Sequence, residues 1–304
     1  MRVFWNSLQF KIPTVFIISF LLILAAIFAV FATIGKNLLD KQAYRQVVLS
    51  GQNIVSELGN RIAFAESLAI ALANLGEKLP SDDAMVMKLA KHVIDLEGTE
   101  TFIAGGGLWP EPYKYDPKIE RRSFFWGRDH QGLLQYFDDY NNPSGPGYHH
   151  EEWYVPAKYT QKDKPFWSKS YMDPYSYQPM VTVTVPMYSG NDFHGVSTID
   201  LKLEGLHTFL EQITKSFDGY AFAVDRNGKF LSYPDELITK VYGVDQQGNR
   251  TEEFITIDEL VRQKPDFYPY ANAIHMTIDY LISNATKLKT YNENIANSIA
   301  SGSY

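Results

Sequence analysis

The sequence predicts an α+β protein that begins with a membrane-spanning helix, and three patterns support this prediction. Residues 12–34 contain no charged side chain, and as a helix they would extend about 34 Å, enough to cross a hydrocarbon core of about 30 Å. From residue 35 to about 79, apolar residues recur three or four positions apart, as on one face of a helix. Residues 180–187 and 195–201 instead alternate along the chain, which predicts an antiparallel hairpin.

The charge-free segment is interpreted as an uncleaved anchor rather than as a signal peptide. A signal peptide has an apolar core of about 7–15 residues, and this segment is longer, although residues 29–32 resemble a cleavage site. Positive charge is usually retained in the cytoplasm, but Arg2 and Lys11 before the segment are matched by Lys36 and Lys41 after it. The N-terminal amine and the long polar remainder favour residues 1–11 in the cytoplasm and export of everything after residue 34.

Composition narrows the range of functions. The 304 residues include no cysteine, which excludes disulfides, thiol chemistry and cysteine metal sites. A net charge of −7 argues against nucleic-acid binding, which usually needs a basic patch. Aromatic residues make up 14% of the chain, and those between Trp109 and Tyr188 lie among too many polar residues to be core alone.

Residues 35–79 are predicted to form a stalk helix. It could be a rigid rod that carries displacement from the bilayer, or a support with one face packed on the domain, and the two interpretations are compatible. A turn at 80–83, a helix over 84–96 and a strand over 101–104 follow. Gly105-Gly106-Gly107 is interpreted as a turn at the end of this strand, because a phosphate loop would need a following Lys-Ser/Thr.

The remainder predicts two antiparallel-sheet lobes, residues 80–217 and 218–304. The first lobe adds a hairpin of 124–126 with 133–137, a short helix over 148–159 and a helix over 203–217. The second has a hairpin of 219–225 with 229–234 around an Asn-Gly turn, a polar loop to about 253, and helices over 257–263 and 269–299. A two-stranded hairpin is marginally stable alone. The second lobe therefore looks incomplete, and we expect the chain to be a fragment of a longer protein.

Three stretches resemble the double Cache extracytoplasmic domain of bacterial transmembrane receptors. They are Tyr148-His149-His150-Glu151-Glu152-Trp153-Tyr154, Tyr171-Met172-Asp173-Pro174-Tyr175, and the hairpin of 180–186 with 195–200. The resemblance covers about residues 36–240 and implies two stacked PAS-like lobes, membrane-distal (80–217, holding the ligand) and membrane-proximal (218–304). It also implies a receptor of the bacterial inner membrane with a periplasmic sensor domain and a homodimer through the stalk helix. The implied output module (chemotaxis, histidine kinase or diguanylate cyclase) is not among the 304 residues.

Members of this family that bind amino acids suggest which residues meet the ligand. In them a Tyr and an Arg-x-Trp-Tyr motif hold the carboxylate, while a Tyr-x-Asp motif and the Asp that ends the last hairpin strand hold the ammonium group. The matching residues here are Trp153, Tyr154, Tyr171, Asp173 and Asp200, and Tyr148 lies near the position of the leading Tyr. Glu151 stands where the arginine would be, and a carboxylate cannot supply the forked pairing that arginine gives a substrate carboxylate.

The residues themselves point to a cationic ligand. Three acids and four aromatics would form an acidic box with aromatic walls, namely Glu151, Asp173, Asp200, Trp153, Tyr154, Tyr171 and Tyr175. An aromatic ring face attracts an ammonium group by about 0.5–2 kcal/mol. The expected ligand is therefore an amine without a carboxylate: a quaternary ammonium compound, a biogenic amine or a polyamine. The competing interpretation is that the aromatics are core and the acids are solvated loop charges.

Other chemistries fit less well. His149 to Glu152 contains metal-ligand types, but neighbours on a helix point about 100° apart, and the spacing is not that of His-Glu-x-x-His. The pairs Asp138-Asp139 and Glu151-Glu152 could serve a glycosidase, but adjacent acids point in different directions. We therefore expect no catalytic residue, metal or cofactor. An exported, membrane-anchored hydrolase and a stand-alone solute-binding protein remain as alternatives to the sensor.

Overall fold

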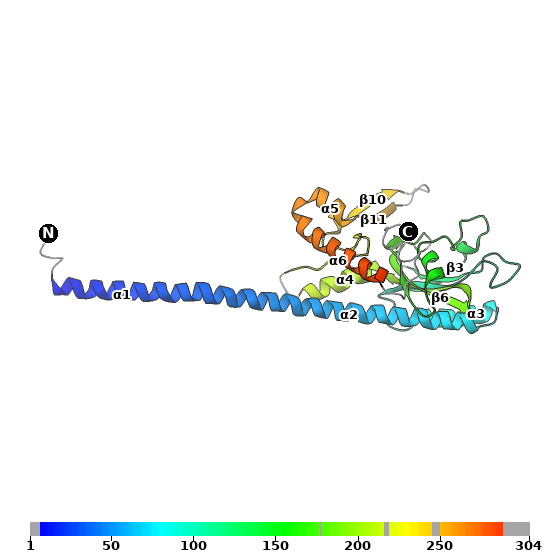
Figure 1. Cartoon of the computed structure of the whole chain (residues 1–304), viewed down its shortest axis with the longest axis horizontal. Coiled ribbons are helices and arrows are strands. Elements are labelled where there is room, and N and C mark those ends of the chain that lie inside the picture. The colour runs from blue at the N-terminus through cyan, green and yellow to red at the C-terminus, as the bar shows by residue number, and fades with distance from the viewer. Residues whose placement is uncertain are drawn as a thin grey trace. The chain divides into compact units, whose positions relative to one another are not determined.

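The computed structural model of the chain describes residues 7–129, 131–174, 176, 178–215, 219–244 and 250–287 (Figure 1). The chain divides into two compact units, Met1–Ser56 and Glu57–Tyr304, and each is described by itself. The first unit contains helix α1 (Leu8–Val30), a π-helical turn (Phe31–Gly35) and the beginning of helix α2 (Lys36–Lys78).

One helix in the described part of the chain is long and apolar enough to cross a membrane. It begins at Phe10, and its mean hydropathy reaches 3.1. The side chains of α1 fit this environment, because large apolar groups such as Phe16, Leu22 and Phe28 are more than half exposed. A helix that is apolar all round and exposed along its length is suited to lipid. This is the candidate transmembrane helix that the sequence predicts.

The second unit is built on a seven-stranded antiparallel sheet in the order β3-β2-β1-β7-β6-β4, with β5 paired to β6. Its strands are β1 (Ile103–Pro110), β2 (Phe124–Arg128), β3 (Leu134–Phe137), β4 (Phe166–Trp167), β5 (Tyr171–Met172), β6 (Pro179–Ser189) and β7 (Asp192–Lys202). β6 and β7 form the hairpin that the alternating sequence predicts, and β2 and β3 form the other predicted hairpin. Helix α4 (Leu203–Thr214) follows, and residues 216–218 of its predicted range lie outside the described residues.

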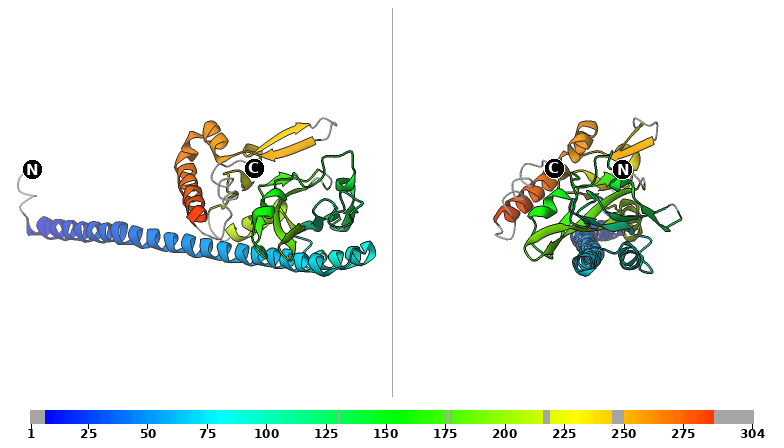
Figure 2. Two further views of the ribbon diagram at one scale, coloured as in Figure 1. Left: turned by 45° about the vertical axis from the view of Figure 1, so that its right-hand side comes forward. Right: turned by 90° about the vertical axis from the view of Figure 1, so that its right-hand side faces the viewer.

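Helices α2 and α3 (Asp83–Ile94) cover one face of this sheet (Figure 2). The buried residues of α2 are small and apolar: Ala65, Leu68, Ala69, Leu72 and Ala73. The alanines let the helix backbone come close to the sheet, and Ser197 Oγ donates a hydrogen bond to the Ala69 carbonyl at 2.7 Å. Asp82 caps α3, because its carboxylate accepts a hydrogen bond from Met85 N.

The three glycines at 105–107 lie inside β1, so the predicted turn at the strand end is wrong. They pair with the neighbouring strands, as Gly105 does with Gly127 of β2 and with Asp200 of β7. A β-carbon on Gly105 would collide with the carbonyl oxygen of Trp126, and β-carbons on the next two glycines would meet backbone oxygens as well. The strand lies so close to its neighbours that only glycine fits here.

A smaller second lobe follows α4. Its elements are β8 (Ala223–Val224), β9 (Phe230–Ser232), β10 (Lys240–Val244), β11 (Arg250–Phe254), α5 (Ile257–Gln263) and α6 (Tyr268–Lys287). Where a polar loop to about residue 253 is predicted, β10 and β11 form a hairpin. The sequence does not indicate this hairpin, because β10 is mostly exposed and has no buried face. The lobe has its own core around Phe230, Ile257 and Phe267. The rest of the predicted last helix, 288–299, lies outside the described residues.

The helix predicted over 148–159 is only partly right. A single 3-10 segment, Val155–Tyr159, is present, and Trp153 and Tyr154 lie in the turns before it. Pro156 is the physical reason, since a proline has no backbone N–H and therefore interrupts the hydrogen bonds of a continuous α-helix. The loop that contains these aromatic residues is held by its packing on the sheet.

Candidate ligand-binding site

The face of the sheet opposite α2 carries Asp200, near the end of β7. Side chains alternate along a strand, and Ile199 packs on the α2 side, so Asp200 points to the other face. Asp200 pairs with Gly105 on one side and with Thr182 on the other, and Gly105 pairs with Gly127. Because both of these β1 and β2 positions are glycine, no side chain projects from these strands beside Asp200.

Asp200 ends a chain of hydroxyl groups. Thr182 Oγ1 donates to Asp200 Oδ1 at 2.7 Å and lies 2.7 Å from the hydroxyl of Tyr171. Since a hydroxyl carries one proton, Thr182 accepts from Tyr171 while it donates to Asp200. No donor among the described residues bonds Asp200 Oδ2. The chain therefore fixes the orientation of the carboxylate and leaves one of its oxygens available to a ligand.

A second carboxylate, Asp173, lies close enough to affect the first. It follows β5, where its N–H donates to the Gln178 carbonyl and its Oδ2 accepts from Ser176 N at 2.6 Å. Asp173 is 2% exposed and Asp200 is 3% exposed. The pKa of Asp200 is raised to about 7, mainly by burial and also by the Asp173 carboxylate, while the Thr182 hydrogen bond acts in the opposite direction.

Glu151 is the third carboxylate. It lies in the turn after Tyr148, to whose carbonyl its N–H donates at 3.1 Å. Burial raises the pKa of Glu151, and so do Asp173 and Glu152. In the described part of the chain, no base is among the groups that shift the pKa of Glu151 or of Asp200.

We name Glu151, Asp173 and Asp200 the acidic cluster. Asp173 interacts with both other acids, so an ionised Asp173 makes the ionisation of Glu151 and of Asp200 less favourable. Removing charged groups from water is costly unless an opposite charge compensates them. A cation that entered the cluster would supply this compensation.

Glu152, the next residue along the chain, has a different environment. Its carboxylate accepts from Arg226 Nη2 at 2.8 Å, and Arg226 Nη1 also donates to the Trp167 carbonyl. The Trp167 ring nitrogen in turn donates to Glu66 of α2 at 2.9 Å. Arg226 lies in the turn between β8 and β9, so these bonds connect the Glu151 loop with the second lobe and with α2.

Two of the aromatic residues predicted to bind the ligand are part of the buried core. Tyr148 and Tyr154 are fully buried, and their hydroxyls donate to the Pro110 carbonyl at 2.6 Å and to the Glu111 carboxylate at 2.7 Å. These bonds fix the loop to the end of β1. Neither hydroxyl donates to a carboxylate of the acidic cluster within the described part of the molecule.

The other predicted aromatic residues have different positions. Trp153 is 4% exposed and packs on Trp109, with 4.7 Å between ring centroids, and the Trp109 ring nitrogen donates to Thr198 Oγ1. Thr198 shares the Asp200 face of β7, so this indole pair borders that face. Tyr171 takes part in the hydroxyl chain described above, while Tyr175 lies outside the described residues.

The sequence interpretation overlooked three residues that shape this site: Thr182, Trp109 and Gly105. The alternation of 180–187 predicts which face of the strand Thr182 occupies, but it does not predict that Thr182 pairs with Asp200. That register depends on an irregularity between Met187 and Tyr188, next to the hairpin turn, which no pattern in the sequence indicates. For Gly105, the Gly-Gly-Gly run could have indicated a close approach of strands, but such a run is also typical of a turn.

The histidines next to Glu151 lie against each other. The rings of His149 and His150 are 4.1 Å apart between centroids. Burial lowers the pKa of His149, and the neighbouring His150 lowers it further. No group of three or more His, Asp or Glu residues within the described ranges is placed to hold a metal ion.

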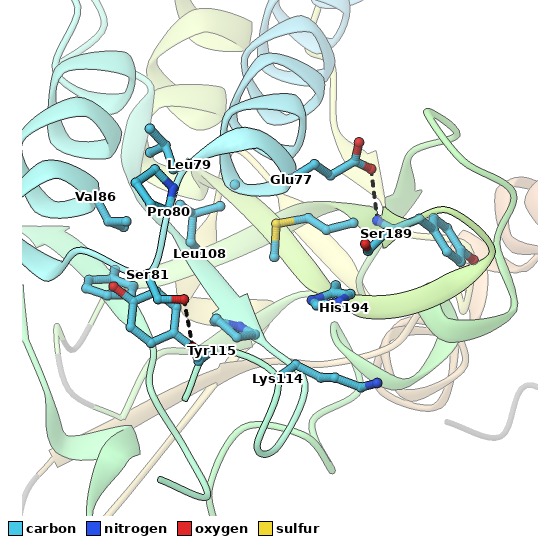
Figure 3. Close-up of a pocket in the computed structure, with 15 residues that line it drawn as sticks. Glu77, Leu79, Pro80, Ser81, Val86, Leu108, Lys114, Tyr115, Ser189 and His194 are labelled. Carbon is cyan, nitrogen blue, oxygen red and sulfur yellow. Dashed lines mark hydrogen bonds between the residues drawn. The ribbon is translucent and has the colours of Figure 1, made fainter. Parts of the chain in front are cut away.

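A separate pocket of about 140 Å³ lies at the C-terminal end of α2 (Figure 3). In it Glu77 accepts from Tyr188 N at 2.8 Å, and Ser81 Oγ donates to the Tyr115 carbonyl at 2.8 Å. Small-molecule sites usually enclose about 300 Å³ or more. This pocket is smaller, and these polar groups bond each other, so we attribute it to the packing around the end of α2.

Comparison with known families confirms the predicted resemblance. Residues 93–208 match the model of the methyl-accepting chemotaxis protein-like, first PDC sensor domain. This range contains all seven strands of the large sheet and the whole acidic cluster. No protein of curated function matches the chain in sequence.

Solved structures of receptor domains are similar to this chain. Methyl-accepting chemotaxis protein X is 20% identical with a TM-score of 0.54, and the match covers 66% of this chain and 77% of that one. An extracellular domain assigned to the histidine kinase mmHK1S-Z3 is 17% identical with a TM-score of 0.53, covering 74% and 98%. The ligand-binding domain of the Pseudomonas fluorescens chemoreceptor CtaA, solved with L-valine, is 19% identical with a TM-score of 0.43, covering 69% and 75%.

Proposed function

We propose that this protein, whose residues 93–208 form a PDC-type sensor domain, is a membrane-anchored receptor for a small amine, bound in the acidic cluster. The sensor role is supported by the family model, the receptor-domain fold and the candidate transmembrane helix. The ligand class rests on one observation: Asp173 interacts with two further buried or half-buried acids, and no described base shifts the pKa of Glu151 or Asp200.

A cationic ligand satisfies this site better than an amino acid does. An ammonium group would bond the available oxygen of Asp200 and lower the cost of ionising the cluster. The carboxylate of an α-amino acid would instead face Glu151, a like charge, within the same cluster. We therefore place quaternary ammonium compounds, biogenic amines and polyamines first, and amino acids second.

The proposed topology follows the N-terminal amine, the long polar remainder and the sensor family. Residues 1–11 would lie in the cytoplasm, 12–34 in the bacterial inner membrane, and the stalk (35–79) and the two lobes (80–217 and 218–304) in the periplasm. A homodimer through the stalk is favoured by exposed apolar residues of α2 such as Val47 and Val55. The output would be of chemotaxis, histidine kinase or diguanylate cyclase type, and the first two are the classes named among the matching structures.

The contacts around Glu152 offer a route for the signal. Glu151 touches the proposed ligand, and its neighbour Glu152 is bonded to Arg226 of the second lobe. Arg226 also bonds the Trp167 carbonyl, and the Trp167 ring bonds Glu66 of α2. A small movement of the Glu151 loop would therefore be felt both by the second lobe and by the helix that continues towards the membrane.

Calorimetry on the full chain in lipid nanodiscs tests this proposal. Choline, histamine and putrescine are titrated into wild type, Asp173→Ala and Glu151→Gln, with alanine as the amino-acid comparison. A charge-assisted contact is worth about 1.5–3 kcal/mol, so each substitution should weaken amine binding about ten- to a hundredfold. Glu211→Gln, an exposed acid on α4, is the matched control and should leave binding unchanged. Tight binding of alanine with no binding of the amines would overturn the ligand class.

A further inference from the structure

A crevice of about 640 Å³ opens where α2, the sheet, α4 and the β8–β9 hairpin meet. Its volume lies within the range of about 300–1,000 Å³ that small-molecule sites enclose. Most of the lining residues are apolar, among them Trp167, Leu206 and Phe209. None of the acidic-cluster residues lines it, so it is distinct from the site proposed above.

One cation in this crevice is held in place but has no anion to bind. The Arg61 guanidinium lies over the rings of Phe209 and Phe102, 4.7 Å and 5.5 Å from their centroids. Within the described ranges the Arg61 side chain makes no hydrogen bond and no ion pair. Stacking on two rings restricts the guanidinium and leaves its N–H donors available in their fixed fork.

Four other charged groups line the crevice. Asp225 is an acid and cannot bind an anion, and its Oδ2 is buried without a hydrogen-bond partner among the described atoms. The other three are already engaged. Glu66 accepts from the ring nitrogen of Trp167 at 2.9 Å. Arg226 is paired with Glu152, 2.8 Å away. Lys202 donates its side chain to the Glu100 carbonyl at 2.9 Å. Arg61 therefore remains as the group that can bind an incoming anion.

We propose that the crevice binds a small amphipathic carboxylate, with the carboxylate paired to Arg61 and an aryl or alkyl body lying on the apolar wall. The stretch of α2 that lines the crevice, from Leu58 to Glu66, rises about 12 Å at 1.5 Å per residue. This length suits a molecule the size of a phenylalkanoate. The ligand would touch α2, α4 and the second lobe together, so its binding would act on the elements that carry the signal from the acidic cluster.

The test uses 4-phenylbutyrate as the probe, titrated calorimetrically into the full chain in nanodiscs, with empty nanodiscs subtracted. 4-Phenylbutylamine and 4-phenylbutanol have the same body with a positive and a neutral end, and all three probes are compared in Asp200→Asn, in which the acidic cluster no longer binds amines. We expect saturable binding of the carboxylate and at least tenfold weaker binding of the other two. Arg61→Gln should weaken carboxylate binding about ten- to a hundredfold, because it removes a charge-assisted pair. Arg262→Gln, an exposed arginine on α5, is the matched control.

Two further variants keep the result interpretable. Leu206→Trp should abolish phenylbutyrate binding by filling the crevice, and this test does not depend on Arg61. Asp200→Asn should leave phenylbutyrate binding unchanged while it removes amine binding, which separates this site from the acidic cluster. Absence of saturable binding, equal binding of the three probes, or unchanged binding in both Arg61→Gln and Leu206→Trp would overturn the proposal. Self-association of the wild type that Leu206→Trp abolishes, without phenylbutyrate binding, would assign the crevice to a second copy instead.

Discussion

Replacing Asp200 by asparagine should change how the stability of the protein depends on pH. Burial raises the pKa of Asp200 to about 7 in the folded protein, against about 3.9 in an unfolded chain. Between these values the folded protein holds a proton that the unfolded chain has released, so the Asp200 contribution to stability is lost as pH rises. The loss is about 1.4 kcal/mol per pH unit and about 4 kcal/mol in total.

Asparagine cannot ionise, and its side-chain oxygen can still accept the hydrogen bond from Thr182. Asp200→Asn should therefore match wild type near pH 4 and exceed its unfolding free energy by a gap that grows to about 4 kcal/mol by pH 8. Urea denaturation of the full chain in nanodiscs, followed by tryptophan fluorescence, measures this gap. The buffers must contain no amine, because an amine buffer would occupy the proposed site and reduce the effect.

An exposed aspartate provides the control. Lys114 hydrogen-bonds Asp192 and lowers the pKa of that carboxyl. A lowered pKa gives stability that is present at neutral pH and lost in acid. Asp192→Asn should thus change stability slightly and in the opposite direction with pH. If the gap between wild type and Asp200→Asn stays constant from pH 4 to pH 8, Asp200 is not a protonated, buried group and the reasoning fails.

Three further predictions address the fold, the hydroxyl chain and the topology. Gly105→Ala should lower the unfolding free energy by about 1–3 kcal/mol in urea denaturation, because the added carbon meets backbone; unchanged stability would contradict the close strand packing. Thr182→Val should weaken amine binding about tenfold in calorimetry by removing a donor to Asp200, whereas Thr184→Val, whose buried hydroxyl has no partner among described atoms, should not; equal effects would refute the hydroxyl chain. A reporter that works only in the periplasm should be active when fused after Tyr304, and activity of a cytoplasmic reporter alone would reverse the proposed orientation.

Most of the fold could be predicted because its elements have strong periodicity. The long helix ending at Lys78 and the β6–β7 hairpin repeat their patterns many times, and the first helix is apolar over a long continuous segment. The elements that were not predicted are those whose stability comes from contacts with other parts of the fold and not from a pattern of buried side chains. β10 is mostly exposed and leaves no buried face to detect, and the glycines of β1 are in a strand only because neighbouring backbones approach closely.

The candidate site could be predicted less completely, for a similar reason. Asp173, Asp200 and Glu151 were identified by their resemblance to a known pattern, and electrostatics links Asp173 with each of the other two. The roles of Tyr148 and Tyr154 could not be predicted, because they depend on hydrogen-bond partners at the end of β1, about 40 residues away in sequence. A buried tyrosine that braces a loop and one that lines a pocket have the same sequence signal.

The most direct test of the central claim is the pKa of the Asp200 carboxyl, measured by ¹³C NMR on aspartate-labelled full chain with and without the tightest-binding amine. The signal is assigned by its loss in Asp200→Asn. Without ligand we expect the Asp200 carboxyl to have a pKa of about 7. A cation bound within about 4–6 Å should lower it by about 1–3 units. A pKa that stays at its ligand-free value when the protein is saturated with amine would show that the amine binds elsewhere, and would contradict the assignment of the acidic cluster as the ligand site.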